Sequence, residues 1–129
     1  MEFAFAKPVD ILGTQYLIEV RDNDRVFNKN KAFGYCNTSA KKIIIRDLVS
    51  KKEDADGKRD SLIFMKKTVR HEIVHAFMQE SGLGYNTRLL NEAWATNEEM
   101  VDWFALQGPK IMKVWNDIGV LNDFDEGGE

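Results

Sequence analysis

The chain contains two histidines, and they have the spacing of a metal site. His71 and His75 are four residues apart, and Glu72 follows the first of them, in the stretch RHEIVHAFMQESG. Residues at i and i+4 are neighbours on a helix, so both imidazoles can bind one ion, and imidazole suits Zn²⁺. Glu72 is rotated by about 100° from His71 and can take a proton from a metal-bound water. The pattern therefore predicts hydrolysis by metal-activated water.

A catalytic zinc site with two histidines needs a third protein ligand, and a carboxylate is the natural donor here. No histidine remains, and Cys36, the single cysteine, is expected to be a buried and inert thiol. The stretch NEAWATNEEMVDW offers Glu92, Glu98 and Glu99. A helical wheel favours Glu98, because it shares a face with apolar residues, whereas the other two suit solvated positions better. The ion would offset the cost of burying that carboxylate.

Asp102 lies one turn after Glu98 on the same face of that predicted helix. Metal-bound histidines usually donate their second N–H to a carboxylate or a carbonyl, so Asp102 is the candidate partner for His71. A cap, or an ion pair with a surface lysine, is the alternative role for Asp102.

The order His71-Glu72-x-x-His75, then Asn97-Glu98-x-x-x-Asp102, resembles the gluzincin clan of zinc metallopeptidases, the thermolysin-like group. The longer runs RHEIVHAFMQESGL and NEEMVDWFALQGPKI are similar to small metallopeptidases encoded by phages and mobile elements of Gram-positive bacteria. The similarity covers residues 70–111 well and GYCNTSAKKIIIRD more loosely. It implies a minimal zincin catalytic domain that binds one Zn²⁺ ion, with Glu98 as the third ligand and Asn97 beside it.

The sequence departs from the larger relatives because it has no third histidine to stabilise the oxyanion of the transition state. Tyr85, in the loop after the histidine helix, is the nearest candidate donor, and a packing role is its alternative. Peptidases commonly bind an extended peptide at a sheet edge, and KIIIRD would form that edge if the arrangement of the relatives holds. Core packing by Ile43 and Ile45 is compatible with that role, since strand residues alternate between faces.

Strands are predicted in the first half of the chain. Residues 15–20 form one, and residues 33–36 and 42–46 flank a loop, NTSAK, that suits a hairpin. Residues 50–60, SKKEDADGKRD, are charged and without period, which predicts a surface loop.

Helices are predicted in the second half. The first covers residues 61–81, with Asp60 or Ser61 as its cap and Gly82 as its stop. Its wheel places apolar residues on one side and the histidines among apolar residues on the other, which predicts a central helix covered on both sides. The apolar side comprises Leu62, Val69, Ile73, Ala76 and Phe77.

A second helix is predicted over residues 91–107, where Trp103 points away from the Glu98 face. Gly108-Pro109 is expected to break or kink it, and Pro suits the first turn of a third helix over residues 109–117.

Composition indicates one α+β domain over the 129 residues, with β structure in about 1–50, helices in about 60–119 and a flexible tail from 120. The small sheet, antiparallel or mixed, is expected to pack on the active-site helix. The net charge of −3 is dispersed, which argues against nucleic-acid or membrane binding. The sequence shows no secretion signal and no spanning segment, so a cytoplasmic location is expected.

The preferred hypothesis is a zinc metallopeptidase that hydrolyses a peptide or protein substrate, with Glu72 as general base. One alternative is a non-catalytic zinc domain. A second is a regulatory or host-interaction protein of a mobile element that keeps the metal site for a single protein partner. A helical protein without metal is the weakest alternative.

Overall fold

The computed structural model describes residues 6–82 and 98–123, without the side chains of residues 30, 98, 99, 101, 102 and 105. Within these ranges the chain is α+β, as predicted, with a four-stranded sheet and three helices. The elements in chain order are β1 (Ala6–Ile11), β2 (Thr14–Arg21), α1 (Arg25–Asn30), β3 (Gly34–Asn37), β4 (Lys42–Arg46), α2 (Ala55–Glu80) and α3 (Glu98–Asp117).

The sheet is mixed, with the strand order β1-β2-β4-β3. β1 pairs with β2 and β3 with β4 in antiparallel fashion, whereas β2 and β4 are parallel. The predicted hairpin and the bounds of β4 are confirmed. The expectation that KIIIRD forms the sheet edge is wrong, because β4 lies between β2 and β3. The edge beside β4 is β3.

β1 and α1 were not foreseen from the sequence. β1 contains Pro8, which lowers the strand signal and is tolerated because β1 is an edge strand. α1 has six residues, too few for a clear apolar period, and it begins where the Asp24 side chain accepts a hydrogen bond from the Val26 N–H. The sequence pattern of each element is too weak to predict it, because each depends on the residues that pack around it.

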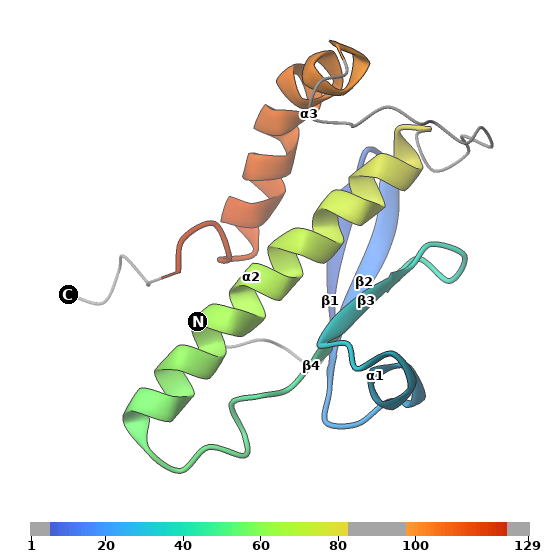
Figure 1. The fold of residues 1–129 in the computed structure, drawn as a ribbon. Coiled ribbons are helices and arrows are strands. Elements are labelled where there is room, and N and C mark those ends of the chain that lie inside the picture. Colours follow the sequence, from blue (N-terminus) through green and yellow to red (C-terminus); the bar gives the residue numbers. More distant parts are fainter. Residues whose placement is uncertain (1–5, 83–97, 124–129) are drawn as a thin grey trace.

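α2 lies across one face of the sheet (Figure 1). It begins at Ala55, so the prediction of a loop over residues 50–60 is wrong for its second half. The cap is Asp54, whose carboxylate accepts a hydrogen bond from the Gly57 N–H, rather than Asp60 or Ser61. The first turns of α2, residues 55–60, are mostly exposed and polar, so they have no apolar period from which a helix could be predicted.

The apolar side of α2 faces the sheet as predicted, with Leu62 only partly buried. Together with the inward residues of the strands it forms the core, to which α3 and the residues just after it also contribute. This core comprises Val9, Ile11, Tyr16, Ile18, Val20, Ile43, Ile45, Met65, Val69, Ile73, Ala76, Phe77, Trp103, Ile111, Ile118 and Val120.

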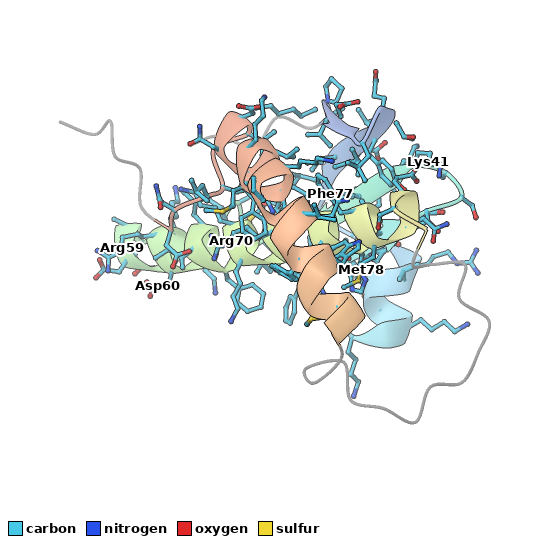
Figure 2. All side chains as sticks on the ribbon, turned by 90° about the horizontal axis from the view of Figure 1, so that it is seen from above. Lys41, Arg59, Asp60, Arg70, Phe77 and Met78 are labelled. Carbon is cyan, nitrogen blue, oxygen red and sulfur yellow. The ribbon has the colours of Figure 1, made fainter. Side chains whose placement is uncertain are left out.

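α3 is one helix that continues through Pro109, so the predicted break is wrong, whereas the alternative expectation of a kink agrees with the change of direction along α3 (Figure 1). It crosses α2 near Phe77 (Figure 2). Trp103 is buried and its Nε1–H donates to the Ser81 hydroxyl at 2.7 Å, so the side of α3 that carries Trp103 packs on α2. The hydrogen bond from Trp103 to Ser81 therefore joins α3 to the C-terminal end of α2.

The chain after α3 returns to the middle of α2. Arg70 donates one hydrogen bond to the Val120 carbonyl at 2.9 Å and another to the Asp123 carboxylate at 3.0 Å. Residues 120–123 are therefore held against the helix, which differs from the flexible tail expected from residue 120.

Candidate metal centre

α2 brings the two imidazole rings together, as the i, i+4 spacing predicts. The Nε2 atoms of His71 and His75 are 3.1 Å apart, and the ring centroids are 4.8 Å apart. Both side chains are exposed, so the expectation of a helix covered on both sides is not met on the histidine side. An ion from solvent can therefore reach both nitrogens.

The distance between the nitrogens fits a shared metal ion. Two Zn–N bonds of 2.0–2.1 Å at a tetrahedral angle would place their nitrogens about 3.3 Å apart. The observed separation of 3.1 Å is close to that value, and it also suits a hydrogen bond from one ring to the other. Ligand-type atoms of His71, Glu72 and His75 all lie within 4.8 Å of one another. The donor set therefore suits zinc.

Glu72 differs from the histidines in its surroundings. It is 7% exposed, because its position on α2 turns it toward the sheet. Burial raises the pKa of its carboxyl, and the nearby His71 opposes that rise. A carboxylate in a poorly solvated position beside a metal is suited to accepting and returning a proton.

The pKa of His75 is lowered below its ordinary value, because partial burial and the neighbouring His71 both disfavour the charged ring. A neutral imidazole is the form that binds a metal ion. The surroundings of the ring thus favour the ligating form.

Cys36, on β3, does not join the histidines in the described part of the chain. Burial, with a smaller contribution from the Glu72 charge, raises the pKa of its thiol to about 12. A protonated thiol is a poor ligand and a poor nucleophile. This agrees with the expectation of an inert cysteine, although its side chain is only partly buried.

The other predicted site residues lie outside what the structure describes. Glu98 opens α3 and Asp102 follows one turn later, but only their backbone is described. Glu92, Asn97 and Tyr85 lie in residues 83–97, outside the described ranges. The third ligand therefore remains a prediction.

β3 runs alongside α2, which the sequence did not reveal. The Phe33 ring, just before β3, lies 5.0 Å from the Phe64 ring. At Gly34, an added Cβ would lie 2.6 Å from the Thr68 methyl. Two residues later, on the same face of β3, Cys36 lies near enough to Glu72 for that carboxylate to raise the pKa of its thiol. Strand and helix therefore run side by side in the same direction. Only the absence of a side chain at residue 34 permits this approach.

Comparison of the chain with known protein families, curated proteins and solved structures finds no match. None of the helices in residues 6–82 and 98–123 has the length and apolar character needed to cross a membrane.

Proposed function

We propose that this protein is a zinc-dependent peptidase. The observation that carries the proposal is the convergence of two exposed imidazole nitrogens, 3.1 Å apart, beside the buried carboxylate of Glu72. Exposure of both rings leaves room for a solvent molecule and a substrate next to the ion. A buried, enclosed histidine pair would instead favour a structural role.

Each residue has a distinct part in this proposal. His71 and His75 would hold the ion, and Glu98 would supply the third ligand, as the resemblance to gluzincins implies. Bound zinc would activate a water molecule and polarise the substrate carbonyl. Glu72 would accept a proton from that water and later donate it to the leaving amine. The fold's contribution is to fix His71, Glu72 and His75 on one helix, α2.

The substrate would lie along β3, the last strand of the sheet on that side among the residues that the structure describes. The Arg46 N–H donates to the Phe33 carbonyl, and the register pairs Tyr35 with Ile44. In an antiparallel pair, alternate residues point their N–H and C=O groups to the partner strand. The backbone groups of Gly34 and Cys36 therefore point away from β4, toward the edge, where an extended peptide can add as a strand.

Glu72→Gln tests the proposal. The amide keeps the size of the side chain and removes its basicity, so we expect about one bound zinc per chain and a loss of hydrolysis of about a hundredfold or more. Zinc content by mass spectrometry and cleavage of a mixed peptide library are the two measurements. Hydrolysis that survives in Glu72→Gln would contradict the assignment of Glu72. No cleavage by the zinc-loaded wild type would contradict the peptidase.

A further inference from the structure

Two aromatic rings are exposed together where α2 meets the start of β3. Phe33 is 45% exposed and Phe64 is 41% exposed, although their rings pack edge to face at 5.0 Å. Single exposed apolar residues are common on protein surfaces. This pair is different, because it joins two elements and still leaves ring surface open to solvent.

Phe64, one member of the pair, lies on the same face of α2 as the two histidines. Phe64, Thr68, His71 and His75 follow the i, i+4, i+7, i+11 spacing of one helix face. His71 lies seven positions after Phe64, which corresponds to about 10 Å along the helix axis. An extended peptide advances about 3.3 Å per residue, so about three residues span that distance.

The strand brings the pair to the same edge. Phe33 directly precedes Gly34, whose backbone groups point away from β4. A peptide added there would pass the aromatic pair at one end of the strand and the histidines at the other, because β3 and α2 run side by side.

We infer that Phe33 and Phe64 form a subsite for one bulky apolar side chain of the peptide substrate, about three residues from the cleaved bond. This inference rests on the proposed function, since it needs the peptide to lie along β3. The aromatic pair would contact a side chain such as Leu, Met or Phe and so select among peptides. The subsite would determine specificity and take no part in the chemistry.

A capture experiment tests the subsite without relying on turnover. Full-length Glu72→Gln protein, loaded with zinc, is used to capture peptides from a synthetic library with randomised positions, and mass spectrometry identifies those retained. We expect an enrichment of about tenfold for large apolar residues over alanine at one position. The wild type should then cleave the selected peptides about three residues from that position.

Three further variants in the same background locate the contact. Phe64→Ala and Phe33→Ala should each reduce the enrichment to less than about threefold, whereas Phe64→Leu should keep most of it. Phe104→Ala is the matched control, because Phe104 is 46% exposed and lies on α3. It should leave the enrichment unchanged. Circular dichroism checks that each variant is folded.

The outcomes separate the subsite from the proposed function. Enrichment that persists in both Phe64→Ala and Phe33→Ala would overturn the subsite. So would capture with no apolar preference, or no capture at all. If the wild type still cleaves peptides in these cases, the peptidase stands and only the subsite is lost. Selected peptides that depend on Phe64 but are never cleaved would keep the subsite and contradict the peptidase.

Discussion

The imidazole rings of His71 and His75 are exposed, whereas the carboxylate that follows the first ring is buried. This division suits a hydrolytic centre, because the ligands face solvent and the proton acceptor is held in a poorly hydrated position. It also follows from local geometry. A one-residue step turns a helix by about 100°, so Glu72 faces the sheet while His71 does not.

The third ligand is the residue whose assignment needs an experiment first. We expect Glu98→Ala to weaken zinc binding by a factor of about a hundred or more, and Glu99→Ala to change it by less than about threefold. Competition with a zinc-binding dye measures both constants. Glu99, the next residue along α3, is the matched control, because it has the same side chain at the adjacent position. Equal effects, or the reverse order, would move the third ligand.

Glu80, at the end of α2, is a carboxylate that stabilises the fold. It accepts hydrogen bonds from the buried Tyr16 hydroxyl and from Lys41, both at 2.7 Å. The hydrogen bond from Lys41, followed by that from Tyr16, lowers the pKa of Glu80 below its ordinary value of 4.5. The folded state therefore favours the charged carboxylate. Its contribution to stability is complete above about pH 4.5 and is lost as the pH falls through the lowered pKa.

We expect Glu80→Gln to reduce the free energy of unfolding at pH 7 by about 1–2 kcal/mol, allowing for the partial exposure of Lys41. The difference from wild type should shrink as the pH falls below about 4.5. Urea denaturation at several pH values measures it, with Glu53→Gln, an exposed glutamate before α2, as the control. A difference that is independent of pH would contradict this account of Glu80.

At the scale of elements, the contact between β3 and α2 depends on Gly34. An added Cβ would lie 2.6 Å from the Thr68 methyl and 3.2 Å from the Ile44 carbonyl oxygen. We expect Gly34→Ala to lower the free energy of unfolding by about 1–3 kcal/mol, because the strand and helix must separate. Thr68→Ser removes the methyl and retains a hydroxyl that can donate to the Phe64 carbonyl. Adding it to Gly34→Ala should therefore restore part of the loss.

Thermal and urea unfolding of the single and double variants measure this coupling. Gly108→Ala is the control, since an added Cβ there meets nothing within 4 Å. It should not destabilise the protein. If Gly34→Ala is as stable as wild type, close approach of β3 to α2 is not a constraint on the fold.

The elements that the sequence predicted are those with a strong local pattern. The run Ile43-Ile44-Ile45 predicted β4, and apolar period predicted the core side of α2. The first turns of α2 and all of α1 lack such a pattern. Strand order could not be predicted, because the parallel pairing of β2 with β4 depends on contacts between distant residues. Because of this strand order, the strand proposed to bind the peptide is β3, whereas the sequence had suggested β4.

The same distinction applies to the site. The histidine pair needs only one helix, so its spacing in the sequence was sufficient to place both rings together. Glu98 and Asp102 require α3 to meet α2 at a particular angle, which no local pattern determines. The aromatic pair of Phe33 and Phe64 also requires two elements, and exposed phenylalanines have no distinctive sequence signal.

At the scale of the molecule, the two histidines of the candidate metal centre lie outside the hydrophobic core. The hydrophobic core joins the sheet, α2 and α3, and neither histidine belongs to it. The ion would bind on the outer side of a helix that the core already holds in place. Metal-free protein should therefore remain folded, unlike small zinc domains that unfold without their ion.

The zinc content of protein purified without a polyhistidine tag tests the central claim most directly. Wild-type protein equilibrated with zinc and then dialysed should retain about one ion per chain, whereas His75→Ala should retain almost none and keep the same circular dichroism spectrum. Mass spectrometry of the metal measures both. Wild-type protein that retains no more zinc than His75→Ala would show that the two imidazoles only bond to each other, and the proposed hydrolase would then be wrong.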